Sequence, residues 1–352
     1  MTDFEVQRLG LIMAPQPGNP LEANGVLNPA AVRGPDGHLY LFPRLVAKGN
    51  YSRIGIARVL FNGDGSPTGV ERIGIALEPE ADYELRPDGQ GGCEDPRVTF
   101  VKPLGHYVMT YTAFSPRGPR IAVAVSDDLL KWRRLGLATF EPYDSLEFDG
   151  IDNKDASVFP VAVPDPFGKP ALAMLHRPLF PGTRPEEKAG NSEYTVEDLH
   201  RESIWISYRD ISLEACESNR LCHFTSHHRL AAPVAPWEIL KIGGGTPPIL
   251  TPLGWLLIYH GVSEVEGSIC YSAGVMVLST ENPSQVLYRS PTPLLTPQES
   301  QERLGIISNV VFPTGIDQRS DLGMADRFNV YYGMADDMIG VIRLSIPERL
   351  PH

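Results

Sequence analysis

The sequence predicts an all-β protein built as a five-bladed β-propeller, and three observations lead to this fold class. Glycine and proline each occur 33 times in 352 residues, which interrupts the chain too often for long helices and favours short strands joined by turns. Hydrophobic residues make up 42% of the chain, which is enough for a packed core. A pair of strand-like segments also recurs along the chain, which is typical of repeated β-units.

The recurring pair consists of an aromatic-rich strand followed by a strand of small residues. The small-residue strands begin at Ile54, Ile121, Ile204, Ala273 and Ile339, so successive starts lie 67, 83, 69 and 66 residues apart. Aromatic-rich strands precede four of them, at 38–42, 107–111, 255–259 and 328–332. Five repeats predict five blades, each too small to bury its own faces without its neighbours.

These repeats divide a single domain, 1–352, into blades at about 26–80, 91–140, 150–210, 240–290 and 305–350. Small residues such as Gly55 and Gly340 are expected in the inner strands, where the blades crowd around a central axis. The longest interval contains a polar segment near 181–200, which we expect to be a loop inserted at the rim of a binding site. A β-sandwich with coincidental spacing is the competing fold.

Composition and charge exclude several classes of function. The net charge is −12, which argues against a nucleic-acid partner because such proteins need a basic surface. No apolar run is long enough to cross a membrane, and the first residues do not resemble a signal peptide. The four cysteines are too sparse for a disulfide framework or a zinc site, so a cytoplasmic protein with reduced thiols is expected.

A cluster of charges around a proline is the first candidate site. Glu94 and Asp95 precede Pro96 and Arg97, and a proline disfavours helix in the residue before it. Asp95 is therefore expected on a rigid, non-helical corner. Such a corner also suits a plain structural salt bridge, so this segment by itself leaves both interpretations open.

Polar residues at corresponding corners of the other repeats strengthen the functional interpretation. Each has an ordinary structural explanation when taken singly, but five blades would bring them to one axial pocket. Carboxylates in such a pocket suit general-acid work on a glycosidic bond, whereas a group of Lys, Arg and His suits a phosphate dianion. The candidates are Asn28, Arg33, Arg44, Glu94, Asp95, Asn153, Lys154, Asp155, Arg177, Lys241, His260 and Asp336.

The order of several short motifs resembles glycoside hydrolase family 130, the inverting β-mannoside phosphorylases and related β-mannosidases. That family adopts a five-bladed propeller, which agrees with the repeat count. The resemblance runs from about residue 25 to residue 345 and rests on Asn28-Pro-Ala-Ala-Val-Arg33, Glu94-Asp-Pro-Arg97, Gly118-Pro-Arg-Ile-Ala122, Asn153-Lys-Asp155, Phe159-Pro160, His176-Arg-Pro178, Lys241-Ile-Gly-Gly-Gly245, Gly254-Trp255, Tyr259-His-Gly261 and Tyr332-Gly-Met-Ala-Asp336.

The resemblance implies an acid and the groups around the substrate. Asp95 would be the acid, delivering its proton through the mannose 3-hydroxyl. Mannose would be held by Asn28, Arg33, Arg44 and Asp336, and Glu94, Asn153 and Asp155 are expected to line the same site.

Phosphate is the other reactant that the resemblance implies. Lys154, Arg177, Lys241 and His260 would bind it, and phosphate would replace water as nucleophile. In the family the position near residue 154 is often arginine. Lysine binds phosphate as a point charge, so the contact at this position stays open.

The expected partners are a β-mannosyl oligosaccharide and inorganic phosphate, with no cofactor and no metal. The resemblance also implies a homo-oligomer. Two alternatives stay open: a β-mannosidase that uses water with Glu94 or another glutamate as base, and a non-catalytic propeller that binds carbohydrate or protein. The basic group favours phosphorolysis, because the hydrolysing relatives lack part of it. The linkage, β-1,2, β-1,3 or β-1,4, and the acceptor sugar are not determined by these patterns.

Overall fold

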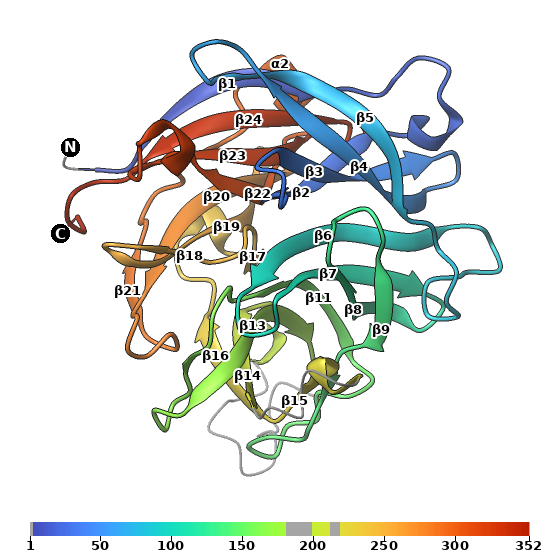
Figure 1. Cartoon of the computed structure of the whole chain (residues 1–352). Helices are drawn as coiled ribbons and strands as arrows, with labels where there is room; N and C mark the ends of the chain where they lie inside the picture. The colour runs from blue at the N-terminus through green and yellow to red at the C-terminus, as the bar shows by residue number, and fades with distance from the viewer. Residues whose placement is uncertain (1–2, 181–198, 212–218, 352) are drawn as a thin grey trace.

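The computed structural model describes residues 3–180, 199–211 and 219–351 and shows an all-β chain (Figure 1). The predicted all-β class is confirmed. The predicted inserted loop near 181–200 falls mainly on 181–198, which lie outside the described residues. Helical structure in the described residues comprises Leu199 and His200 and single turns at Pro20–Glu22, Asn219–Cys222, Pro236–Glu238, Ser300–Arg303 (α2) and Arg319–Leu322.

The strands form five antiparallel units of about four strands each. The strands are β1 (Glu5–Met13), β2 (Val26–Arg33), β3 (Leu39–Ala47), β4 (Tyr51–Phe61), β5 (Pro67–Leu77), β6 (Gly91–Val101), β7 (His106–Ser115), β8 (Gly118–Ser126), β9 (Arg133–Leu137), β10 (Thr139–Phe140), β11 (Asp152–Val158), β12 (Val163–Pro164), β13 (Pro170–Leu179), β14 (Ile204–Asp210), β15 (His223–Phe224), β16 (Ser226–Ala231), β17 (Lys241–Gly244), β18 (Ile249–Thr251), β19 (Gly254–Val265), β20 (Ser268–Leu278), β21 (Val286–Arg289), β22 (Val311–Gln318), β23 (Arg327–Met334) and β24 (Met338–Ser345).

Each unit runs outward from a first strand. The orders are β2-β3-β4-β5, β6-β7-β8-β9, β11-β13-β14-β16, β17-β19-β20-β21 and β22-β23-β24-β1. The first two units are joined by a short parallel pairing of β4 with β6, through Tyr51 with Gly91 and Ser52 with Gly92. The first strands lie toward the centre of the molecule, where β2 contacts both β6 and β22, and β11 contacts both β6 and β17.

The last unit is completed by the opposite end of the chain. Strand β1 pairs antiparallel with β24, from Glu5 with Ser345 to Met13 with Ile339, and the two termini lie on the same side of Figure 1. The repeat pattern predicted no strand at residues 5–13. The third predicted blade, 150–210, ends before the fourth strand of that unit, β16.

Five hydrophobic clusters fill the spaces between consecutive units. One cluster lies between each neighbouring pair, and the fifth joins the last unit to the first, through residues such as Ile12, Leu41 and Val341. Side chains alternate between the two faces of a strand, so a strand between two clusters is apolar on both sides. In β19, Leu256 lies in one cluster and Leu257 in the next.

The repeated small-residue segments are all strands, but they are not the inner ones. They lie in β4, β8, β14, β20 and β24, the third strand of each unit. The prediction that these small residues are crowded at a central axis is therefore wrong. They are crowded instead by side chains of neighbouring strands in their own units. A Cβ at Gly55 would lie 2.9 Å from Leu45 Cδ1, and one at Gly340 would lie 2.7 Å from the Tyr332 ring.

Within the described residues, no helix is long and apolar enough to cross a membrane. The same residues contain no group of three or more His, Cys, Asp or Glu side chains arranged to hold a metal ion.

Candidate active site

Bulges in the first strands carry the central charged residues. The strand register shifts between Leu27 and Ala30 in β2, between Glu94 and Arg97 in β6, and between Lys154 and Ser157 in β11. The residue within each shift has a left-handed backbone: φ is 44° at Asn28, 46° at Asp95 and 57° at Asp155. Asn and Asp adopt this conformation more readily than other non-glycine residues, and a bulge redirects a side chain out of the regular alternation. Three neighbouring strands thereby turn a polar side chain toward one site.

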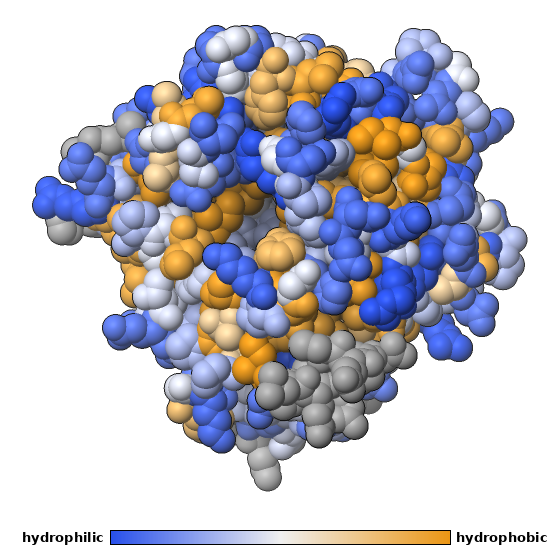
Figure 2. All heavy atoms as spheres, in the orientation of Figure 1, coloured by the Kyte–Doolittle hydropathy of each residue, from blue (hydrophilic) through white to orange (hydrophobic). Residues whose placement is uncertain are grey.

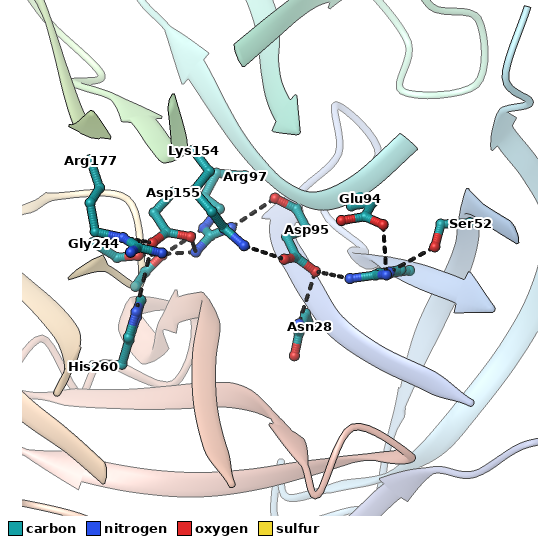
Figure 3. A network of polar contacts seen from close by, with 12 residues as sticks. Asn28, Ser52, Glu94, Asp95, Arg97, Lys154, Asp155, Arg177, Gly244 and His260 are labelled. Carbon is teal, nitrogen blue, oxygen red and sulfur yellow. Dashed lines mark hydrogen bonds and ion pairs between the residues drawn. The ribbon is translucent and has the colours of Figure 1, made fainter. Parts of the chain in front are cut away.

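Asp95 is the centre of an acidic group made by Asn28, Arg44, Glu94 and Asp95 (Figure 3). Asn28 Nδ2 donates to Asp95 Oδ1 at 2.9 Å, and Arg44 Nη1 donates to the same oxygen at 3.2 Å. Arg44 also donates to Glu94 Oε1 at 2.8 Å and to Ser52 Oγ at 2.9 Å. Asn28, Glu94 and Asp95 are all buried. Arg44 therefore contacts both carboxylates.

The charges around these carboxylates shift their pKa values in opposite directions. Burial opposes ionisation of Asp95, but the positive charges of Arg44, Lys154 and Arg97 and the Asn28 hydrogen bond outweigh it, and the pKa of Asp95 is lowered. For Glu94 burial dominates over Arg44, and the charge of Asp95 adds to it, so the pKa of Glu94 is raised. Asp95 is thus the carboxylate of this pair that ionises first.

Asp336 joins this group from the β23–β24 hairpin. It follows Met334, which pairs with Met338, and its φ is 53°. Burial, opposed by Arg44 and reinforced by the charge of Asp95, raises the pKa of Asp336 to about 6. Asp336, one of the predicted residues, therefore lies close enough to this group for the charges of Arg44 and Asp95 to shift its pKa.

A basic group lies beside the acidic one. Asp155 Oδ2 accepts from Arg177 Nε at 2.7 Å and lies 3.7 Å from His260 Nε2. Lys241, at the start of β17, has its Nζ 5.6 Å from the centre of the Tyr271 ring, and that ring lies 6.1 Å from the His260 ring. The charge of Lys241 also acts on His260. Burial favours the neutral form of Asp155, but Arg177, Lys154 and His260 outweigh it and hold the pKa of Asp155 far below its ordinary value.

His260 is a neutral histidine rather than the cation expected from the sequence. Burial, together with the positive charges of Arg177, Arg97 and Lys241, lowers its pKa to about 3 despite the opposing charge of Asp155. Its ring packs against Phe312 with centres 4.4 Å apart. A neutral imidazole still presents one N–H donor, so His260 can bind an oxyanion through a hydrogen bond.

Arg97 and Lys154 connect the two groups. Arg97 is buried and donates to the backbone oxygens of Asp95, Gly244 and Gly245 at 2.7, 3.0 and 2.8 Å, and its Nη2 lies 3.9 Å from Asp155 Oδ1. Lys154 Nζ lies 4.0 Å from Asp95 Oδ2, and its side chain is 29% exposed. Lys154 is therefore the cation that reaches both the acidic group and solvent.

Several buried polar atoms of this site have no hydrogen-bond partner among the described residues. They are Asn28 Oδ1, Asp155 Oδ1, and both ring nitrogens of His260. A buried polar atom without a partner costs roughly 1–3 kcal/mol. Their concentration at one place indicates a surface prepared for a polar ligand. Figure 2 shows a hollow near the middle of the molecular face, where Figure 1 places the first strands.

The structure does not bring two of the predicted residues to this cluster. Arg33 lies further along β2 and donates to both oxygens of Asp317 at 2.8 Å, because the two side chains form a bidentate pair on adjacent units. Asn153 lies beside Lys154, but alternation in β11 turns its side chain away, to His176 Nδ1 at 3.0 Å. Asn28, Arg44, Glu94, Asp95, Lys154, Asp155, Arg177, Lys241, His260 and Asp336 remain around the site.

One residue at the site, Glu202, was not among the predicted ones, and Arg97 was predicted only as part of the charged cluster around Pro96. Arg97 belongs to the quoted Glu94–Arg97 motif. Its complete burial, which marks it as part of the site, is visible only in the folded structure. Glu202 forms an ion pair with Arg177 Nη1. No motif marks Glu202, because its contact depends on how β14 is placed beside β13.

The fold and the site together define a class of protein: an all-β protein in which a buried group of carboxylates lies beside a buried basic group. The comparisons with known proteins name the family. The model of glycoside hydrolase family 130, described as beta-1,4-mannooligosaccharide phosphorylase, matches residues 13–350, so this chain belongs to that family.

Characterised relatives agree with this family. The chain is 31% identical to a 1,2-beta-oligomannan phosphorylase of Thermoanaerobacter sp. (strain X514), over 96% of this chain and 95% of the relative. It is 36% identical to a beta-1,4-mannooligosaccharide phosphorylase of Ruminococcus albus, over 45% of this chain and 46% of the relative. A beta-1,2-mannobiose phosphorylase from Listeria innocua has the same fold, with a TM-score of 0.70, 22% identity and 97% of each chain covered.

Proposed function

We propose that this protein is an inverting β-mannoside phosphorylase, which cleaves a β-mannosyl oligosaccharide with inorganic phosphate to give α-mannose 1-phosphate and a shortened sugar. Membership of family 130 and the mannoside phosphorylases among its relatives support this activity. The observation that carries it is the adjacency of the Asp95 group and the Arg177–His260 group, joined by Lys154 and Arg97. One group suits protonation of a leaving oxygen, and the other suits an attacking anion.

We also propose that the five units are the blades of a β-propeller. The five clusters between consecutive units and the pairing of β1 with β24 support a ring in which the first strands surround the axis. The site then lies at the axis, where side chains of several blades meet.

The proposed reaction follows from the two groups. A proton passes from the carboxyl of Asp95 to the glycosidic oxygen, directly or through a sugar hydroxyl, and the C1–O bond to the leaving sugar breaks. A phosphate oxygen forms the new bond to C1 from the opposite face, which inverts the configuration. Phosphate is already an anion, so no second carboxylate is needed to activate it.

Asp95 must carry a proton for this step, although its pKa is lowered in the free protein. Bound phosphate would bring negative charge beside Lys154, and negative charge raises the pKa of a nearby carboxyl group. Exclusion of water by the sugar would raise it further. We infer that Asp95 becomes protonated in the complex with both substrates, so the acid is formed only where it is used.

Phosphate is assigned to Lys154, Arg177, Lys241 and His260, and mannose to Asn28, Arg44 and Asp336. Glu94 and Asp155 orient the cations of the two groups. The relative that covers nearly the whole chain is named for a β-1,2 linkage, which favours a β-1,2-linked substrate over a β-1,4-linked one. A cytoplasmic location and a homo-oligomeric state stay predictions.

The test is a product assay in the synthetic direction. The protein is incubated with α-mannose 1-phosphate and with mannose, glucose, N-acetylglucosamine or a mannobiose as acceptor, and released phosphate and new disaccharides are measured. Phosphate release that depends on the acceptor would establish a phosphorylase, and the linkage of the product would identify the substrate. Release of mannose from β-mannobiose in phosphate-free buffer, without synthesis, would instead establish the β-mannosidase alternative.

A further inference from the structure

Arg177 is almost completely buried and is bound by two carboxylates at once. Its Nε donates to Asp155 Oδ2 at 2.7 Å, and its Nη1 forms an ion pair with Glu202 Oε2. The side chain of Arg177 is 5% exposed. An incoming anion therefore meets a guanidinium whose Nε and Nη1 are already bound by carboxylates, and it must compete with one of them for either donor.

The two partners differ in their freedom to move. The Asp155 side chain is fully buried in a strand bulge and is also approached by His260 and Arg97. The Glu202 side chain is 26% exposed, and it precedes β14 rather than lying inside a sheet. Its backbone is anchored, because Glu202 O accepts from Ile242 N at 3.0 Å. Rotation of the side chain into solvent would leave that anchor intact.

The nitrogen that Glu202 uses is one that a phosphate would need. Asp155 occupies Nε, so the terminal nitrogens of the fork remain for a ligand. Glu202 is paired with Nη1 of Arg177. The hydrogen bond from Ile242 N to Glu202 O also brings the backbone of Glu202 beside Lys241, another residue of the basic group. A carboxylate and a phosphate cannot share this position, because like charges in a site with little water repel strongly.

We propose that Glu202 is an internal anion that occupies the phosphate position of the free protein and is displaced when phosphate binds. It would lower the affinity for phosphate and keep Arg177 paired when phosphate is absent. This proposal rests on the proposed function, in which Arg177 is a phosphate ligand. It adds a residue that sets how much phosphate the enzyme requires.

The test is Glu202→Gln, which keeps the shape of the side chain and removes its charge. We expect the KM for phosphate to fall by about tenfold, which corresponds to about 1.4 kcal/mol, because the negative charge that competes with phosphate for Arg177 is gone. The KM for the mannoside should stay within about twofold, because the contacts of Glu202 with described residues are to Arg177 and Ile242, which are not in the acidic group. An unchanged or raised KM for phosphate would overturn the proposal and make Glu202 a residue that only orients Arg177.

Two further variants separate the effect of the Glu202 charge from other effects of substitution. Glu202→Asp retains the charge on a shorter side chain and should give an intermediate KM for phosphate. Glu5→Gln removes an exposed carboxylate from β1, at the outer edge of the last unit, and should leave both KM values unchanged.

Calorimetric titration of inorganic phosphate without sugar separates this proposal from the proposed function. Tighter phosphate binding by Glu202→Gln, in a protein that does not perform phosphorolysis, would support the role of Glu202 and refute the function. Phosphorolysis with equal phosphate affinity in wild type and variant would support the function and refute the role of Glu202. Failure of the wild type to bind phosphate would refute both.

Discussion

The three carboxyl groups around Arg44 have pKa values shifted in different directions. The pKa of Asp95 is lowered, that of Glu94 is raised and that of Asp336 is raised to about 6. The differences come from position: Asp95 accepts hydrogen bonds from Asn28 and Arg44 and faces three cations, whereas burial dominates at the other two. Neighbouring carboxylates with separated pKa values are typical of sites that move protons.

Replacement of the proposed acid should remove turnover without removing the anion site. For Asp95→Asn we expect kcat to fall at least about 100-fold, the usual size of a lost general acid. Phosphate affinity should fall no more than about twofold, because the amide still fills the same volume. Phosphorolysis kinetics and calorimetric titration of phosphate check this, and near-normal turnover would refute the assignment.

Loss of a proposed phosphate ligand should weaken phosphate binding and leave the KM for the mannoside unchanged. Lys241→Ala or His260→Ala should raise the KM for phosphate by about tenfold, which corresponds to one charge-assisted or neutral hydrogen bond lost in a buried site. Lys131→Ala, at an exposed lysine, is the control. A rise in the mannoside KM with no change for phosphate would place these residues in the sugar site instead.

The raised pKa of Asp336 predicts a pH dependence of stability. An acid whose pKa is higher in the folded state destabilises the fold once it ionises, so the penalty is absent below the ordinary value of 3.8 and complete above about pH 6. Asp336→Asn removes this charge. Its melting temperature should exceed that of the wild type by a few degrees at about pH 8, and the difference should vanish near about pH 4. Calorimetry at the two pH values measures it, and an equal difference at both would mean that ionisation of Asp336 is not the cause.

At the scale of the element, the bulges of the first strands decide where the chemistry lies. A regular strand would send Asn28, Asp95 and Asp155 to alternate faces within the sheets, whereas the bulges turn them toward the centre. The left-handed backbone at these residues is strained, and such strain is characteristic of functional sites.

One glycine tests how closely these elements fit. A Cβ at Gly333 in β23 would lie 2.1 Å from Asn28 Oδ1. Gly333→Ala should therefore push the Asn28 amide away from Asp95 and lower kcat by about tenfold, the effect of one misdirected hydrogen bond. Gly74→Ala is a matched control, because a Cβ there meets nothing within 4 Å. A crystal structure of the variant should show the displaced amide, and full activity would show that Asn28 does not position the acid.

At the scale of the whole molecule, the ring of five clusters holds the site together. Each unit is packed on both faces, so a gap between any two would loosen strands that carry site residues. Pairing of β1 with β24 covers the outer edge of the last unit, and Arg8 of β1 forms an ion pair with the buried Glu302 at 3.0 Å.

Removal of β1 should consequently destabilise the entire molecule. Deletion of residues 1–13 exposes the β24 edge, takes Ile12 and Met13 from the fifth cluster and leaves Glu302 without Arg8. We expect a loss of about 5 kcal/mol or more, seen as a much lower melting temperature or as aggregation. Deletion of residues 1–3 keeps β1 intact and should behave as the wild type. Equal stability of both deletions would show that β1 is not a structural part of the ring.

Much of this molecule could be predicted from local pattern. The all-β class, the repeated strands and the order of the family motifs are local properties, because alternation, proline and glycine act on their own neighbourhoods. Most of the candidate site follows from the same motifs, which carry Asn28, Asp95, Asp155 and their basic neighbours.

Other features depend on residues that are distant in sequence. Arg33 resembles a site residue in the sequence, but in the fold its Nε and Nη2 donate to Asp317. Asn153 is directed to His176 by strand alternation. His260 resembles a cation until complete burial makes it neutral. Strand β1 has no visible partner until β24, from the far end of the chain, is placed beside it.

Local sequence patterns were enough to predict a β-protein of repeated units with an acidic motif and a basic set in the order of family 130. The folded chain was needed to show which of those charges meet, which groups are neutral and that Glu202 pairs with Arg177. Strand patterns are set by neighbours in the chain. Burial, pairing and pKa values are set by whichever side chains the five units bring together.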